Sequence, residues 1–349
     1  MIGRIEQFTR EKNRSDRYFS AGVLLLMAVS ILLFTGSAPA LAAQTTPPPY
    51  THAWYVNNPD TNDHGVMWWR GYNDGARDST SCTNALAVLD FGQVGYEAGG
   101  SYGGYGTYDF AYGYPFISDG TIEAATEMYA SGWYQATSAC PRLKVVIGTN
   151  NYHQCPYGGA CSPNTAGQQW GNVVNSVQTW LNNNGVAWQI TAWAGDDMEQ
   201  SAGNGGYDCG SQGSPTRSFV DGFNSNNPAN DLFLDFGTAW VPVPADGSCW
   251  SAADVQYVAF VATADWPLPE IYFGQATDSW VNVRRQYLMW FLGVMTTCNQ
   301  DDPITGNTCT FPSGWFTPTS AWWDLWNKLN QYQVGQSSLN YATNIRYQR

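Results

Sequence analysis

Short apolar runs alternate with stretches of helical spacing along most of the chain. The runs that predict buried strands are residues 65–72, 85–93, 143–151, 186–194, 231–239 and 269–275. Apolar residues spaced three or four apart predict helices over 121–137, 166–184, 214–225, 251–264, 278–297 and 320–332. A strand and a helix about every 40 residues are typical of βαβ units, which form a parallel sheet. Because the runs are almost continuously apolar, we expect both faces of this sheet to be covered.

This alternation favours a single-domain α/β fold, a (β/α)8 TIM-like barrel. A barrel needs eight strands, and the missing two could lie within 100–118 and 298–318. A doubly wound open sheet is the alternative. No G-x-G-x-x-G opens a helix directly after a predicted strand, which argues against a nucleotide-binding version of that sheet. We therefore expect no nucleotide and no other cofactor.

The first 43 residues have the layout of a secretory signal peptide. A stretch rich in arginine precedes the apolar run 21–34, and Ala40-Leu41-Ala42 supplies an A-x-A cleavage signal. The apolar run is short for a membrane span of about 20 residues, although an uncleaved anchor remains the alternative. We expect a Pro-rich spacer over 44–60, the barrel domain over 61–349, and a protein secreted or held at the cell surface.

The charge balance of the chain excludes one class of partner. Residues 1–43 hold five of the 15 basic and three of the 28 acidic residues, so the remainder has a net charge of −15. A surface of this sign repels nucleic acid, and no basic run interrupts it. We expect a monomer that binds no nucleic acid.

All eight cysteines follow the predicted signal, where an exported chain meets oxidising conditions. An even number predicts disulfides that hold the loops of the domain. Local spacing favours Cys155–Cys161 and Cys298–Cys309, each of which closes a short loop. The pairs Cys82–Cys140 and Cys209–Cys249 would then remain. A zinc site is the alternative, but there is no C-x-x-C pair and the three histidines are scattered, so we expect no metal.

Aromatic and polar residues indicate a possible ligand class. The chain has 17 Trp and 21 Tyr but only 12% charged residues. Flat rings with polar edges suit the faces and hydroxyl groups of sugars, while a large core that uses Trp and Tyr is the alternative.

Polar residues follow nearly every predicted strand at its carboxyl end, where ligands bind in parallel α/β folds. The candidates for substrate binding at or near these ends are Asp90, Asn150, Tyr152, Trp193, Asp235 and Gln275. Trp193 could instead be a core residue. Asp90 and Asp235 each stand in an L-D-F-G stretch, where a carboxylate can accept backbone hydrogen bonds at a tight turn.

The stretch DDMEQ, residues 196–200, follows the strand 186–194 and holds three carboxylates. In an extended chain Asp197 and Glu199 face the same way, about 6 to 7 Å apart along the chain. Two close carboxylates do not ionise independently, so one of them keeps its proton near neutral pH. Glycosidic bond cleavage needs one protonated and one ionised carboxyl group. We assign Glu199 as the general acid and Asp197 as its partner, with a plain acidic loop or a calcium loop as alternatives.

A D-x-E at the end of a fourth strand resembles the lysozyme-type (muramidase) and chitinase-type glycoside hydrolase barrels. The chitinase-type motif has a further Asp two residues before its D-x-E, where this chain has Gly195. The resemblance implies hydrolysis of peptidoglycan or another amino-sugar polymer, with Glu199 as acid and Asp197 beside it. The expected function is thus a secreted glycoside hydrolase acting on a cell-wall or environmental polysaccharide. A non-catalytic carbohydrate-binding or cell-surface protein on the same barrel is the alternative.

Overall fold

The fold lies within one unit of the chain, Thr45–Arg349. The computed structural model describes residues 44–99, 104–109, 115–151, 161–199, 215–226, 232–239, 250–261, 266–298, 311 and 313–347. The expected signal peptide and four expected disulfide partners lie outside these residues, as does one substrate-binding candidate: Cys155, Cys209, Cys249, Cys309 and Tyr152.

A parallel sheet forms the centre of this unit. Its strands follow the order β7-β6-β5-β2-β1-β9-β8. In that order they are β7 (Phe233–Asp235), β6 (Ile190–Asp197), β5 (Leu143–Asn150), β2 (Ala85–Glu97), β1 (His52–Tyr55), β9 (Tyr341–Tyr347) and β8 (Gly293–Cys298). Beyond its parallel partners, β2 also pairs with an antiparallel hairpin of β3 (Gly104–Tyr108) and β4 (Phe116–Ser118). The result is a mixed α/β fold.

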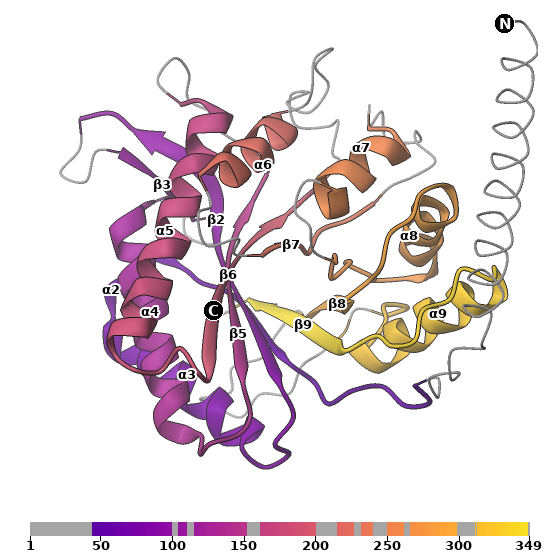
Figure 1. Cartoon of the computed structure of the whole chain (residues 1–349), viewed down its shortest axis with the longest axis horizontal. Coiled ribbons are helices and arrows are strands. Elements are labelled where there is room, and N and C mark those ends of the chain that lie inside the picture. Colours follow the sequence, from indigo (N-terminus) through magenta and orange to yellow (C-terminus); the bar gives the residue numbers. More distant parts are fainter. Residues whose placement is uncertain are drawn as a thin grey trace, which may run out of the picture. The chain divides into compact units, whose positions relative to one another are not determined.

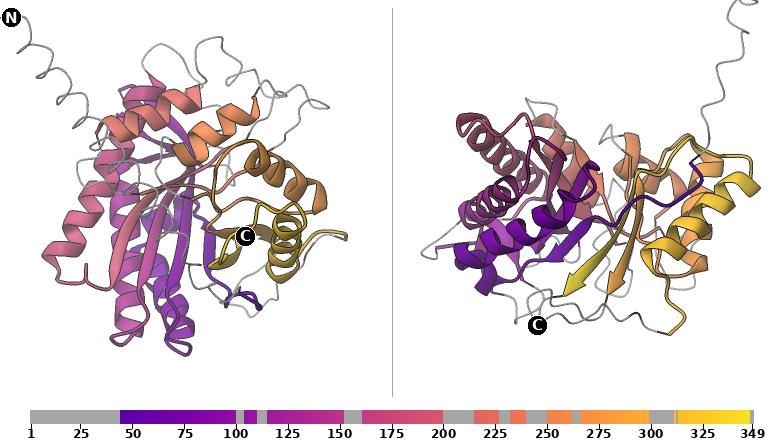
Figure 2. Two further views of the ribbon diagram at one scale, coloured as in Figure 1. Left: turned by 45° about the vertical axis from the view of Figure 1, so that its right-hand side comes forward. Right: turned by 90° about the horizontal axis from the view of Figure 1, so that it is seen from below.

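Helices lie around the outside of the strands, as Figure 1 and the two further views of Figure 2 show. They are α2 (Asn58–Asn62), α3 (His64–Asp78), α4 (Asp119–Ala136), α5 (Pro163–Asn183), α6 (Pro215–Ser225), α7 (Ala252–Gln256), α8 (Gly274–Gln286) and α9 (Pro318–Gln331). A π-helical turn, Tyr257–Val261, continues α7. No helix within the described ranges is long and apolar enough to cross a membrane.

Two apolar clusters cover the two faces of the sheet. The outer cluster joins the strands to the helices. The inner cluster contains residues on or next to the strands and none from a helix. Its buried members are Ala53, Leu86, Val88, Val146, Trp193, Leu234, Phe236, Leu268, Leu292, Met295, Tyr341 and Ile345.

A short extended segment, residues 267–271, hydrogen-bonds to the two edges of the parallel sheet. On one side, the backbone N–H of Leu268 donates to the carbonyl of Asp235 in β7 at 2.8 Å. On the other side, Ile271 donates to the carbonyl of Met295 in β8, also at 2.8 Å, and Met295 donates back to Pro269 at 2.9 Å. This segment therefore satisfies backbone groups of both edge strands.

Four of the predicted strands are confirmed, as β2, β5, β6 and β7, but the strand predicted over 65–72 is wrong because this range lies in α3. Asp63 caps that helix by accepting hydrogen bonds from the N–H groups of Gly65 and Val66. The first strand is instead β1, which lies within the expected spacer and pairs with β2 and β9. Since β1 takes the first place, β6 remains the fourth parallel strand in chain order.

The C-terminal part of the prediction also needs correction. The long helix predicted over 278–297 is two elements, because α8 ends at Gln286 and β8 begins at Gly293. Gly293 lies so close to β9 that a Cβ there would collide with the backbone of Tyr341. The strand predicted over 269–275 is only extended up to residue 271, and α8 begins at Gly274. Neither range proposed for the missing strands contains β9, and the two strands described within 100–118, β3 and β4, are antiparallel.

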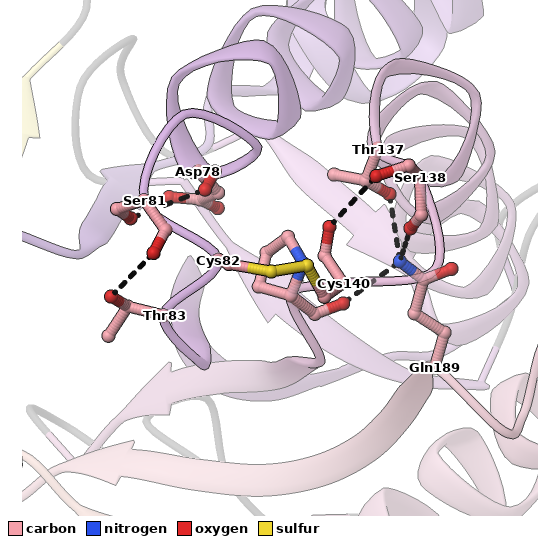
Figure 3. Close-up of a disulfide and its surroundings, with 9 residues drawn as sticks. Asp78, Ser81, Cys82, Thr83, Thr137, Ser138, Cys140 and Gln189 are labelled. Atoms are coloured by element: carbon pink, nitrogen blue, oxygen red, sulfur yellow. Dashed lines mark hydrogen bonds between the residues drawn. A yellow bond between two sulfur atoms is a disulfide. The ribbon is translucent and has the colours of Figure 1, made fainter.

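The disulfide Cys82–Cys140 is confirmed, with its two Cα atoms 5.2 Å apart. It joins the segments that enter β2 and β5, at the amino ends of these strands (Figure 3). Beside it, the Gln189 side chain donates to the carbonyls of Ser138 and Pro141 at 2.6 and 2.9 Å. Cys161 is also disulfide-bonded, and its predicted partner lies outside the described residues.

A buried polar network fixes β1 against α3 and α4. Asp74 accepts hydrogen bonds from Trp54 Nε1 at 2.9 Å and from the Tyr129 hydroxyl at 2.8 Å. The His52 ring lies between Asp74 and Asp78, at 3.2 and 2.9 Å from their carboxylates. Although burial acts the other way, these contacts and Arg77 hold the pKa of Asp74 below its usual value.

Glycines let α3 and α4 pack closely. A Cβ at Gly71 of α3 would collide with the carbonyl of Tyr129, and a Cβ at Gly132 of α4 would collide with the carbonyl of Trp68. The two helix backbones therefore meet directly at this crossing.

We predict that Gly132→Ala lowers the free energy of unfolding by about 1–3 kcal/mol, because the methyl group forces the two helices apart. Gly120 lies in the same helix with no atom within 4 Å of an added Cβ, so Gly120→Ala is the matched control. That control should leave stability unchanged or raise it by up to about 1 kcal/mol through helix propensity. Urea unfolding of the three proteins tests this, and equal midpoints for Gly132→Ala and the native chain would contradict it.

Candidate active site

Four polar side chains continue the inner face of the sheet beyond its apolar cluster. Each lies an even number of residues after an inner apolar residue: Asp90 after Val88, Asn150 after Val146, Asp197 after Trp193 and Glu270 after Leu268. Because side chains alternate along a strand, these four point to the same side as the inner cluster. All four are buried. Asn150 and Asp197 end β5 and β6, Asp90 lies where the pairing of β2 with β1 ends, and Glu270 lies near the end of the segment 267–271.

Phe236 separates these polar groups from the apolar interior. Gly148 and Gly195 lie two residues before Asn150 and Asp197, and a Cβ at either would lie 2.9 Å from the Phe236 ring. The fully buried ring thus occupies the space that two side chains would otherwise fill. It places an apolar floor directly below the polar groups.

Register and a bulge place the groups on β2. Gln93, Asn150 and Asp197 are backbone partners across β2, β5 and β6. The register shifts between Asp90 and Gln93, where Gly92 has a φ of +96°. Asp90 Oδ1 accepts a hydrogen bond from the N–H of Gly92 at 2.8 Å, a turn contact of the kind expected from the sequence.

Asp197 is held by a neighbouring amide. Asn150 Nδ2 donates to Asp197 Oδ2 at 2.9 Å. Among the described residues, three buried polar atoms of this region have no hydrogen-bond partner: Asp197 Oδ1, Asp90 Oδ2 and Gln93 Nε2. A ligand with hydroxyl groups could satisfy them.

Asn151 fixes the backbone of Glu199 just beyond the end of β6. The N–H of Glu199 donates to Asn151 Oδ1 at 2.7 Å, and Asn151 Nδ2 donates to the Glu199 carbonyl at 3.1 Å. Asn151 Nδ2 also lies 3.0 Å from Thr216 Oγ1 in α6. These two hydrogen bonds fix the backbone of Glu199 relative to the sheet. The Glu199 side chain is half-buried at the rim.

Glu270 lies on the segment 267–271 and was missed in the sequence. It is buried, and the Tyr272 hydroxyl donates to Glu270 Oε1. Glu270 stands in the stretch P-E-I-Y-F. The strand predicted over 269–275 placed Gln275, not Glu270, at its carboxyl end. Gln275 lies exposed in the first turn of α8.

The acidic groups interact electrostatically as one cluster, which we define as Asp90, Asp197, Glu199, Asp235 and Glu270. Burial, then the charge of Glu270, holds the pKa of Asp197 well above its usual value. Burial, then the charge of Glu199, does the same to the pKa of Glu270, although the Tyr272 hydrogen bond opposes it. Burial raises the pKa of Glu199 as well. The cluster therefore retains protons near neutral pH.

Two members of the cluster also serve the backbone. Burial raises the pKa of Asp90 to about 7 and that of Asp235 to about 7, against hydrogen bonds from backbone N–H groups. Asp235 Oδ1 accepts from the N–H of Gly237 at 2.9 Å. Because side chains alternate along β7, Asp235 lies on the outer face of the strand with Phe233. It is therefore on the opposite side of β7 from the inner site.

Trp193 lies in the inner cluster, four residues before Asp197, and is buried. Lys144 Nζ lies 4.1 Å from the centre of its ring, a cation–π contact below the apolar floor. Trp193 therefore occupies the core position that was the alternative to a sugar contact. The described residues contain no group of three or more His, Cys, Asp or Glu side chains arranged to hold a metal ion.

Comparisons with known proteins add little to this geometry. No family model matches the sequence, and no curated protein matches it. One solved structure that is similar is described as a complex structure of GH113 beta-1,4-mannanase, with 9% sequence identity and a TM-score of 0.39. The match covers 85% of this chain and 86% of that chain. A likeness at this level of identity and TM-score does not indicate what this chain does.

We predict that Asp90→Asn reduces the pH dependence of stability. With a folded-state pKa of about 7 against the ordinary 3.8, the folded protein keeps a proton that the unfolded chain releases. The free energy of unfolding therefore falls as pH rises from about 4 to about 7, by up to roughly 1.4 kcal/mol per unit of pKa shift. Asparagine keeps the acceptor for Gly92 and carries no charge, so the variant should fall less.

Urea unfolding at about pH 4, 6 and 8 measures this difference. Glu97 is a partly exposed carboxylate at the end of β2, and Glu97→Gln is the control for the loss of one charge. A variant at Asp90 whose stability declines with pH as steeply as that of the native chain would contradict the prediction.

Proposed function

We propose that this protein is a glycoside hydrolase and that the inner site between Glu199 and Glu270 is its active site. The observation that carries the proposal is the pairing of these two glutamates. They come from distant parts of the chain, Glu199 directly after β6 and Glu270 on the segment 267–271, and the charge of Glu199 helps to raise the pKa of Glu270. Glycosidic cleavage requires two nearby carboxyl groups, one protonated and one ionised.

The proposed fold around this site is a closed (β/α)8 barrel. The seven parallel strands supply seven positions, and the segment 267–271 supplies the eighth through its hydrogen bonds to β7 and β8. The inner cluster, with members from all eight positions, supports a packed barrel interior. Glu199 then follows the fourth position and Glu270 lies on the sixth.

In the proposed mechanism Glu199 donates a proton to the glycosidic oxygen as the bond to the anomeric carbon breaks. Its half-buried side chain is nearest to the rim, and Asn151 fixes its backbone. Glu270 acts as the partner carboxyl group: burial and neighbouring charges raise its pKa, and the Tyr272 hydroxyl opposes them by stabilising the ionised form that the reaction uses. The raised pKa of Asp197 lets this group hold a proton close to Glu199. The stereochemistry of the product distinguishes direct attack by Glu270 from attack by a water that Glu270 activates.

The proposed setting is outside the cell, on a cell-wall or environmental polysaccharide such as peptidoglycan. The signal layout of residues 1–43 supports export, and the Cys82–Cys140 disulfide suits an oxidising compartment. The unpartnered polar atoms of Asp90, Gln93 and Asp197 offer hydrogen bonds to sugar hydroxyl groups.

We predict that Glu199→Gln and Glu270→Gln each lower the release of reducing sugar by about 100-fold or more, because each removes one carboxyl role and keeps the shape. The measurement uses a panel of polysaccharides and peptidoglycan. Glu127→Gln is the matched control, since Glu127 lies on α4 and outside the cluster. Full activity in both cluster variants would remove this site from the reaction. Glycan binding without hydrolysis by the native chain would favour the carbohydrate-binding alternative.

A further inference from the structure

Trp315 presents an exposed aromatic ring next to the carboxylate cluster. Its side chain is 36% exposed, although tryptophan is usually well buried. The indole stacks on the ring of Tyr272, with the ring centres 5.0 Å apart and the planes 11° apart. The hydroxyl group of the same Tyr272 donates to Glu270. The exposed ring is thus one side chain away from a proposed catalytic carboxylate.

The contacts around Trp315 hold this ring in a fixed orientation. The N–H of Phe316 donates to the carbonyl of Tyr272 at 2.7 Å, which ties the segment before α9 to the segment before α8. Phe273 contacts the Trp315 ring in an edge arrangement, with the centres 6.4 Å apart and the planes at 61°. The indole is therefore supported by Tyr272 and Phe273 while part of its surface faces solvent. A rigid flat surface of this kind binds with little loss of side-chain entropy.

The chemistry of the surroundings defines what this surface can bind. A pyranose ring with equatorial hydroxyl groups presents a flat C–H face that matches an aromatic ring, and its edge matches hydrogen-bonding groups. The charges that act most strongly on Asp197 and Glu270 are those of other carboxylates. An anionic sugar, such as a uronate, would add a further negative charge beside five carboxyl groups and would make their ionisation costlier still, whereas a neutral or amino sugar would not.

We propose that Trp315 is the stacking platform of a sugar-binding subsite beside Glu270, and that this subsite takes neutral or amino pyranoses and rejects uronates. The proposal rests on the proposed glycoside hydrolase function and names a specificity residue for it. Tyr272 has two roles in this arrangement, because its ring supports the platform and its hydroxyl positions Glu270.

The test separates binding from catalysis. Binding of neutral oligosaccharides and oligouronates of equal length is measured by calorimetry in the Glu199→Gln protein, with and without Trp315→Ala. Kinetics are measured in the otherwise native chain with Trp315→Ala and Trp315→Phe. Trp323→Ala is the matched control, because Trp323 is equally exposed, at 36%, but lies on α9. Thermal unfolding confirms that each variant is folded.

We expect Trp315→Ala to weaken binding of the neutral ligand and to raise KM by about tenfold, with kcat changed less than threefold. Trp315→Phe should recover part of the loss, and Trp323→Ala should bind as the parent does. The oligouronate should bind at least tenfold more weakly than the neutral ligand.

Two results would overturn the role of Trp315 as a stacking platform. One is unchanged neutral-ligand binding in Trp315→Ala, and the other is a fall in kcat alone, which would show that Trp315 acts only by supporting Tyr272. Failure of the proposed function gives a different result, namely full activity in Glu199→Gln whatever the behaviour of Trp315. Tight oligouronate binding would overturn the specificity.

Discussion

Alternation of side chains along paired strands is the constraint on which this structure depends. Parallel pairing fixes the register of β2, β5 and β6. In β2 the inner positions of Leu86 and Val88 place Asp90 on the same face, and in β6 the inner position of Trp193 does the same for Asp197. The apolar interior and the carboxylates are therefore consecutive layers of the same inner surface. A slip of one residue would send Asp90 and Asp197 to the helices and leave the inner layer without its polar groups.

The layering also sets the electrostatics. Phe236, seated against Gly148 and Gly195, keeps the space below the carboxylates apolar. Burial is accordingly the largest influence that raises the pKa of Asp90, Asp197 and Glu270. Burying ionisable groups costs stability. The His52–Asp74–Asp78 network, the direct contact of α3 with α4, and the Cys82–Cys140 disulfide all lie away from the acidic cluster. Stable packing outside the site lets the fold tolerate buried acids with raised pKa values within it.

The site could be predicted in part because its local patterns were strong. An apolar strand followed by D-D-M-E identified Asp197 and Glu199, and the L-D-F-G stretches gave Asp90 and Asp235 with their turn contacts to Gly92 and Gly237. Glu270 was missed because its segment is short and lacks the length of a typical strand; hydrogen bonds to residues far away in the sequence hold it. Trp315 lies in the range 298–318, where a missing strand was expected but no element could be placed, and nothing local marks it as the neighbour of Tyr272.

The sequence by itself determined the alternation of strands and helices, the parallel character of the sheet and the polar residues at the strand ends. These are local properties, since periodicity and turn chemistry act over a few residues. Only the tertiary structure decided that residues 65–72 form a helix, that His52–Tyr55 enter the sheet, and that Glu270 lies near enough to Glu199 for the charge of Glu199 to raise its pKa. Each of these depends on contacts between distant parts of the chain: Gly71 against α4, β1 between β2 and β9, and the segment 267–271 between β7 and β8. Such contacts override local preference because their free energy comes from burial and backbone pairing, which the local sequence does not encode.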